Sequence, residues 1–126
     1  MHLLLDTHIL LWALADDDRL SPRARRVIQE ASDIHVSAAS YWELAIKIGQ
    51  GRLRADLAEI RLAAGQSGFA EIAVSGGHAQ ATLHLANHHK DPFDRLIVAT
   101  AMTEPMRLLT ADSLVAQYTE LALLCP

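Results

Sequence analysis

Short apolar segments alternate with helical segments along this chain, and this alternation restricts the fold more than any other feature. The segments expected to form strands are residues 2–5, 34–36, 69–74, 107–110 and 121–124. The expected helices are residues 7–14, 21–31, 37–48, 56–65, 75–86 and 91–105. Strands separated by helices favour a mainly parallel sheet with right-handed crossovers, because a parallel neighbour is reached only by a long connection. The sequence therefore predicts one α/β domain over residues 1–126, with ligands at the carboxyl ends of its strands.

The composition limits the location and the partners of the protein. Hydrophobic residues make up 51% and charged residues 21% of the 126 positions, which is enough to bury a core and excludes disorder. The longest apolar run, from Ile9 to Ala15, is far shorter than the roughly 18 residues of a membrane span. Cys125 is the only cysteine, and no export leader is visible. We therefore expect a cytoplasmic protein that is not attached to a membrane.

The net charge and the mean hydropathy point to different partners. The formal net charge is −4, with 11 basic against 15 acidic residues. An acidic chain is a poor first guess for a nucleic-acid binder, since affinity for phosphate usually comes from a basic surplus. The mean hydropathy of +0.14 indicates that some apolar surface meets a protein partner.

Four acidic residues lie where the predicted sheet would bring them together. Asp6 and Asp112 follow predicted strands, whereas Glu43 and Asp94 lie in predicted helices. Each also has a purely structural interpretation. The spacings that support it are a capping box from Ser40 to Glu43, a helix start at Asp91, Pro92 and Asp94, and simple helix caps at Asp6 and Asp112.

The surroundings of two of these acids favour a metal site. Glu43 lies within an apolar stretch, and Asp6 follows three leucines, so both carboxylates are expected to be buried. A buried carboxylate needs a counter-charge, and no Lys or Arg adjoins either residue in the sequence. A divalent cation would supply that charge. Oxygen ligands without cysteine or a His-x-x-His spacing favour Mg²⁺ or Mn²⁺ over zinc.

The chain also resembles a known family through four motifs in order. They are Leu-Leu-Leu-Asp6-Thr7, Ser40-x-Trp42-Glu43-Leu44, His89-x-Asp91-Pro92-Phe93-Asp94-Arg95 and Thr110-x-Asp112. This pattern is similar to that of PIN-domain ribonucleases and, more narrowly, of the VapC-type toxins of toxin–antitoxin modules. The resemblance implies a three-layer α/β/α domain with a mainly parallel sheet of about five strands. It also implies hydrolysis of single-stranded or loop RNA, a homodimer, and a small antitoxin that covers the cleft.

The same resemblance implies a role for each matching residue. Asp6, Glu43 and Asp94 would bind one or two Mg²⁺ ions, with Mn²⁺ as a substitute, and Asp112 would be the fourth acid. Thr7 and Thr110 would orient the carboxylates or metal-bound water. Among these positions, His8 departs from the small polar residue expected in many relatives.

Other residues near the motifs carry weaker signals. The candidate RNA contacts are Lys47, Arg52, Arg54 and Arg95, and for each the alternative is a solvated or ion-paired side chain. His88 and His89 are expected in a surface loop. Trp12, Trp42 and Phe93 are expected in the core or at an interface, and not as platforms on which bases stack.

Two other functions compete with a ribonuclease. A PIN-like module could hold RNA or a partner protein with little activity, although such a module would not need all four acids. A signalling receiver domain is also a small α/β fold with an acidic Mg²⁺ pocket. Its chemistry requires paired acids after the first strand and a late lysine, but Asp6 has no acidic neighbour and no lysine follows Lys90.

Overall fold

The central sheet of the protein has five parallel strands. The computed structural model describes residues 1–87 and 90–126, so the prediction for His88 and His89 lies outside the described residues. The strands are β1 (His2–Leu5), β2 (Asp33–Ser37), β3 (Phe69–Ile72), β4 (Arg107–Thr110) and β5 (Ala122–Leu124). Their order in the sheet is β3-β2-β1-β4-β5, and every neighbouring pair is parallel. The predicted parallel α/β sheet is confirmed.

The strand order places a topological switch point beside β1. From β1 the chain moves outward through β2 and β3 on one side, and through β4 and β5 on the other. Leu5, the last residue of β1, is in register with Val36 of β2 and Leu109 of β4. Connections diverge at such a point, which leaves room for a cleft at the carboxyl ends of the strands.

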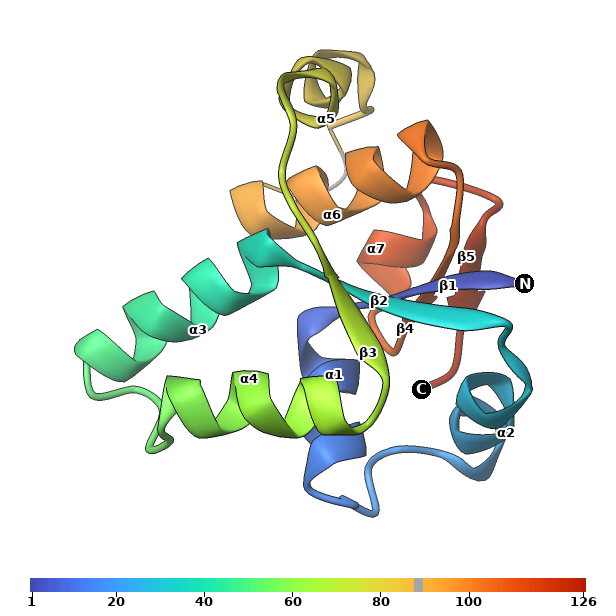
Figure 1. Cartoon of the computed structure of the whole chain (residues 1–126). Coiled ribbons are helices and arrows are strands. Elements are labelled where there is room, and N and C mark those ends of the chain that lie inside the picture. The colour runs from blue at the N-terminus through green and yellow to red at the C-terminus, as the bar shows by residue number, and fades with distance from the viewer. Residues whose placement is uncertain (88–89) are drawn as a thin grey trace.

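Helices cover both faces of the sheet, as Figure 1 shows. They are α1 (Thr7–Leu14), α2 (Pro22–Glu30), α3 (Ala38–Gly49), α4 (Leu57–Gln66), α5 (Gly76–Ala81), the 3₁₀ turn η1 (Thr82–His84), α6 (Pro92–Thr103) and α7 (Ser113–Ala116). The protein has one apolar core on each face of the sheet. The leucines of β1 alternate between these cores, because successive side chains of a strand point to opposite faces. Leu3 and Leu5 pack with residues of α1 to α4, whereas Leu4 packs with residues of α6 and α7. These two cores form the expected three layers.

The structure differs from the sequence prediction between residues 75 and 86. A single helix was expected there, but α5 ends at Ala81 and η1 follows it. The Thr82 hydroxyl donates to the Ala79 carbonyl, and the Arg95 guanidinium donates to the Thr82 carbonyl, so side chains take up the backbone acceptors of a continuing helix. Leu83 is 78% exposed and offers no buried face to extend it.

Smaller differences have simple causes. The third strand was expected to reach residue 74 but ends at Ile72, where its partner β2 also ends at Ser37. The four-residue helix α7 was not expected, because one turn carries no periodic apolar pattern. Within residues 1–87 and 90–126, no helix is both long and apolar enough to cross a bilayer.

Candidate functional site: an acidic cleft beside the central strand

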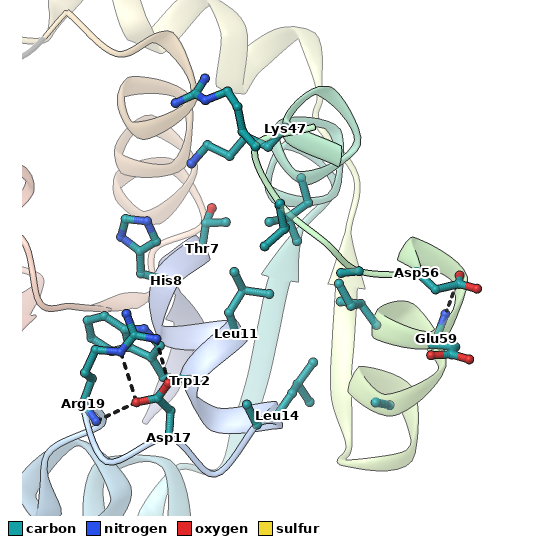
Figure 2. A pocket seen from close by; sticks show the side chains of 17 residues that line it. Thr7, His8, Leu11, Trp12, Leu14, Asp17, Arg19, Lys47, Asp56 and Glu59 are labelled. Carbon is teal, nitrogen blue, oxygen red and sulfur yellow. Dashed lines mark hydrogen bonds and ion pairs between the residues drawn. The ribbon is translucent and has the colours of Figure 1, made fainter. Parts of the chain in front are cut away.

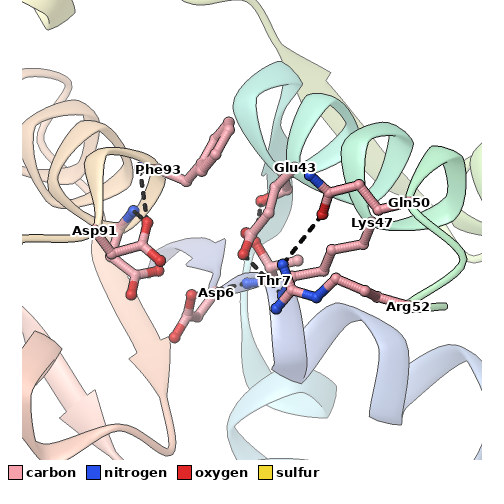
Figure 3. Close-up of polar contacts among 10 residues, drawn as sticks. Asp6, Thr7, Glu43, Lys47, Gln50, Arg52, Asp91 and Phe93 are labelled. Carbon is pink, nitrogen blue, oxygen red and sulfur yellow. Dashed lines mark hydrogen bonds and ion pairs between the residues drawn. The ribbon is translucent and has the colours of Figure 1, made fainter.

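Acidic side chains from four parts of the chain line one cleft of about 200 Å³. Its lining residues are Asp6, Thr7, His8, Glu43, Lys47, Asp91, Asp94 and Asp112. Figure 3 shows Asp6 at the centre, with Asp91 of α6 on one side and Glu43 and Lys47 of α3 on the other. The structure thus brings together all four acids that the sequence singled out, at the edge of the sheet where they were expected.

Asp6 is fixed by two hydrogen bonds at the end of β1. One carboxylate oxygen accepts the backbone N–H of Thr7 at 2.8 Å, which makes Asp6 the N-cap of α1. The other accepts the hydroxyl of Thr110 at 2.7 Å. Burial raises the pKa of Asp6 and the negative charge of Glu43 adds to this effect, although the bonds from Thr110 and Thr7 and the charge of His8 oppose it. The ionised carboxylate is therefore held in place at a cost in desolvation.

Both predicted orienting threonines contact further parts of the site. The Thr110 hydroxyl also accepts the backbone N–H of Asp112 at 3.0 Å, so one side chain connects two of the acids. The Thr7 hydroxyl donates to the hydroxyl of Ser40 at 2.8 Å, which connects α1 to α3. These contacts make both threonines positioning residues.

Glu43 is a buried carboxylate with one oxygen paired and the other unpaired. Its Oε2 lies 3.1 Å from Nζ of Lys47, one helical turn further along α3. Its Oε1 has no hydrogen-bond partner within the described residues. No basic residue adjoins Glu43 in the sequence, but a helix places residue i+4 beside residue i. The ion pair is the alternative that the sequence left open for Lys47. Lys47 supplies a counter-charge that the sequence argument assigned to a metal ion alone.

The capping-box interpretation of Glu43 was also wrong. The N-cap of α3 is Ser37, whose hydroxyl accepts the backbone N–H of Ala39 at 3.0 Å. Ser40 is fully buried inside the helix and bonds to Thr7 instead. Glu43 therefore has no capping role and faces the cleft.

The other acids cap helices and line the cleft at the same time. Asp91 accepts the backbone N–H groups of Phe93 and Asp94 at 2.9 and 3.1 Å, which confirms it as the N-cap of α6. Asp112 caps α7 by accepting the N–H of Leu114 at 2.8 Å. Asp94 lies in the first turn of α6. Positively polarised helix N-termini reduce the cost of gathering this negative charge.

The donor set of the cleft fits Mg²⁺ or Mn²⁺. The acids that line it offer carboxylate oxygens, which hard cations prefer. Burying Oε1 of Glu43 without a hydrogen bond costs free energy, and a bound cation would remove that cost. Across residues 1–87 and 90–126, however, no three Asp, Glu, His or Cys side chains stand as a group that could hold an ion. Binding an ion would therefore require side-chain movement.

The four candidate RNA contacts differ in their positions. Lys47 lines the acidic cleft, and Arg52 lies with it along the adjoining groove, where its Nη1 donates to Oε1 of Gln50 at 3.3 Å. Arg54 is exposed. Arg95 does not line the cleft; its guanidinium donates to the carbonyls of Ala86 and Thr82 and to the hydroxyl of Tyr118, at 3.0 to 3.2 Å. These bonds give Arg95 a structural role between α6, η1 and the segment after α7.

A second and larger hollow adjoins the acidic cleft. We call it the α1–α4 groove; its volume is about 650 Å³, and it shares Thr7, His8 and Lys47 with the cleft. Figure 2 shows Leu11 and Leu14 of α1 facing this space. Its other apolar side chains include Trp12, Leu44, Leu53 and Ile60. The sequence prediction missed the groove, although apolar residues on more than one face of residues 7–14 were a signal for it.

Of the two positions expected for Trp42, the core or an interface, the structure excludes the core. Its side chain is 63% exposed, and its ring lies edge-to-face with Phe93 at a centroid distance of 5.2 Å. Trp12 is partly buried and packs against the core below the sheet.

Comparisons with known proteins agree with this geometry. The PIN domain family model matches residues 3–121. Ribonuclease VapC22 of Mycobacterium tuberculosis is 32% identical over 111 residues, covering 86% of this chain and 85% of the relative. Two solved structures share the fold: VapBC2 from Rickettsia felis bound to a promoter DNA fragment, and a toxin–antitoxin complex from Klebsiella pneumoniae. For the first, the TM-score is 0.69 at 16% identity, covering 98% of this chain and 97% of that one. For the second, the TM-score is 0.64 at 20% identity, covering 95% and 94%. The chain therefore belongs to the PIN-domain family and, within it, to the VapC type.

Proposed function

We propose that this protein is a metal-dependent endoribonuclease and the toxin of a type II toxin–antitoxin system. The observation that carries the proposal is the convergence of Asp6, Glu43, Asp94 and Asp112, from separate parts of the chain, on one cleft. Membership in the VapC type and the printed name of the mycobacterial relative, a ribonuclease, support it. The activity would take place in the cytoplasm.

The four acids would hold one or two Mg²⁺ or Mn²⁺ ions. Such an ion, when bound, activates water and neutralises charge on a phosphodiester. Thr110 orients Asp6 and Asp112 through one hydroxyl, and Thr7 keeps α1 against α3 through Ser40. The bonds of Asp6 to the hydroxyl of Thr110 and the N–H of Thr7 hold this one carboxylate in place before any ligand arrives, which lowers part of the cost of binding.

Lys47 would exchange one anionic partner for another. In the metal-free protein it neutralises Glu43, and its side chain is long and 26% exposed. When Glu43 turns to a metal ion, the ammonium becomes available to an RNA phosphate at the mouth of the cleft. Arg52, on the same side of the α1–α4 groove, would extend this basic track.

The α1–α4 groove is the surface we assign to an antitoxin. It is lined with leucines, it is continuous with the acidic cleft, and its rim carries both Arg19 and Asp17. A segment lying there would bury apolar side chains and could block the cleft at Thr7, His8 and Lys47. The two solved structures of similar fold are toxin–antitoxin complexes, which favours such a partner. A homodimer remains a prediction, to be checked by light scattering.

Cleavage of purified RNA tests the proposal. The wild type should cut single-stranded RNA with Mg²⁺ or Mn²⁺ and not with EDTA, and Asp94→Asn and Glu43→Gln should each lower kcat by at least about 100-fold. Asp56→Asn is the matched control, because Asp56 caps α4 as Asp112 caps α7 but does not line the cleft. If RNA binds but is not cut under any metal condition, the protein is the binding module instead.

A further inference from the structure

An exposed aromatic ring stands next to the acids of the cleft and has no part in the proposed chemistry. Trp42 directly precedes Glu43 on α3, and Phe93 directly precedes Asp94 on α6. Figure 3 shows Phe93 extending from α6 toward α3, beside the carboxylates of Asp91 and Glu43. The pair of rings therefore joins the two helices that form opposite walls of the cleft.

The geometry leaves much of the indole open to a ligand. The two ring planes are inclined by 74°, so the contact is edge-to-face and not a stack. The Trp42 side chain remains 63% exposed. An indole this exposed offers a large apolar area to a partner, while the contact with Phe93 limits its rotation. A ring that is held in place before binding loses little conformational entropy when a flat ligand stacks on it.

We propose that Trp42, supported by Phe93, is a platform on which one unpaired base of an RNA stacks beside the acidic cleft. This inference rests on the proposed ribonuclease function, because the bound phosphate brings the base to the rim. Bases of single strands stack on aromatic side chains without regard to sequence, and an acidic site without a broad basic surface needs such a contact to retain RNA. A contact between two copies of the chain is the competing occupant of this ring, and the test below separates it from RNA.

Fluorescence and kinetics together test the platform. Trp12→Phe leaves Trp42 as the only tryptophan, so its emission reports on Trp42 alone. In stopped-flow mixing, which records binding before cleavage, a 12-nucleotide unstructured RNA should quench this emission in the presence of Mg²⁺, whereas inorganic polyphosphate of equal charge should not. On the same RNA, Trp42→Ala should raise KM by about 10-fold or more and leave kcat nearly unchanged. Trp42→Phe should restore most of the affinity.

Leu83→Ala is the matched control, since Leu83 is also a strongly exposed apolar side chain but lies on η1, which contributes no residue to the cleft, whereas α3 contributes Glu43 and Lys47. It should leave KM unchanged, and circular dichroism should show that each variant is folded. An unchanged KM in Trp42→Ala, or equal quenching by polyphosphate, would overturn the platform. A loss of dimer mass in Trp42→Ala with unchanged RNA affinity would do so as well, by assigning the ring to a contact between copies.

The two levels of inference fail separately. Quenching by RNA without cleavage by the wild type would support the platform and refute the ribonuclease. Cleavage without quenching would refute the platform alone.

Discussion

Replacing Lys47 by methionine tests the electrostatic state of the acidic cleft most directly. Methionine is nearly as long as lysine but carries no charge, so the substitution removes the ammonium and keeps most of the packing. Nζ of Lys47 lies 3.1 Å from Oε2 of Glu43, whose other oxygen is already buried without a partner in the described residues. In the variant, neither oxygen of the Glu43 carboxylate has a donor among the described residues, although Glu43 is only 7% exposed.

The expected loss of stability follows from these numbers. At 3.1 Å the attraction between unit charges is about 5 kcal/mol at an effective dielectric constant of 20. Dehydration of the ammonium offsets part of it, and removing one partner of a fully buried pair costs about 3–5 kcal/mol. Because the Lys47 side chain is 26% exposed, the expected cost is about 2 kcal/mol. For a chain of this size that lowers Tm by about 7 °C.

Thermal unfolding at neutral pH, with EDTA and then with MgCl₂, measures this effect. Arg52→Met is the control, since it removes the same charge from an exposed side chain on the same groove, and it should change stability by at most about 0.5 kcal/mol. In MgCl₂ the deficit of Lys47→Met should shrink, because the cation takes over the charge of Glu43. A Tm of Lys47→Met equal to that of Arg52→Met in EDTA would refute the reasoning. So would a difference in Tm between Lys47→Met and the wild type that MgCl₂ leaves unchanged.

Three further substitutions probe the bonds around the cleft. The pKa of Asp6 is raised in the folded protein above its ordinary value of 3.8. The protonated carboxyl therefore stabilises the fold below pH 3.8, and this stabilisation is lost as the pH rises through the raised pKa. Asp6→Asn, which stays neutral, should be more stable than the wild type at neutral pH. Urea unfolding from pH 3.5 to 7.5 should show this gain growing with pH, and added Mg²⁺ should no longer stabilise the variant. Thr110→Val removes the donor to one of the two carboxylate oxygens of Asp6 and leaves the N–H of Asp112 without its acceptor, so calorimetry should show Mg²⁺ affinity reduced about 10-fold. Arg95→Gln loses hydrogen bonds to two carbonyls and a tyrosine and should cost about 1–2 kcal/mol in urea unfolding, while the Mg²⁺ affinity stays that of the wild type.

The sequence predicts the sheet well because its strands are buried on both faces. Leu3, Leu4 and Leu5 are all fully buried, and such continuous apolar runs between capped helices are typical of parallel strands. The helix expected at residues 75–86 failed for a reason outside that window. Arg95, 13 residues beyond Thr82, bonds to its carbonyl and stabilises a turn that no local pattern specifies.

At the site, too, the sequence predicts some features and not others. The acids at strand ends are predicted to meet because parallel topology brings carboxyl ends to one edge. The pairing of Glu43 with Lys47 is the ion-paired alternative that the sequence left open for Lys47, and the i to i+4 spacing on a helix accounts for it. The exposure of Trp42 could not be predicted, since an aromatic residue in an apolar helical stretch is usually buried.

The structural and the functional interpretations of the acids are compatible in this fold. A helix that follows a parallel strand begins at the carboxyl edge of the sheet, so a carboxylate that caps it already lies at that edge. Asp6 and Asp112 accept backbone N–H groups of α1 and α7 while both line the cleft. The helix N-termini thus help to hold negative charges close together before any cation is present. The acidic surplus of the chain, a net charge of −4, equals the number of acids proposed as metal ligands, which are Asp6, Glu43, Asp94 and Asp112. If the proposed cations bind there, the surplus does not argue against RNA as the substrate, because the charge that RNA meets is that of the metal-loaded cleft.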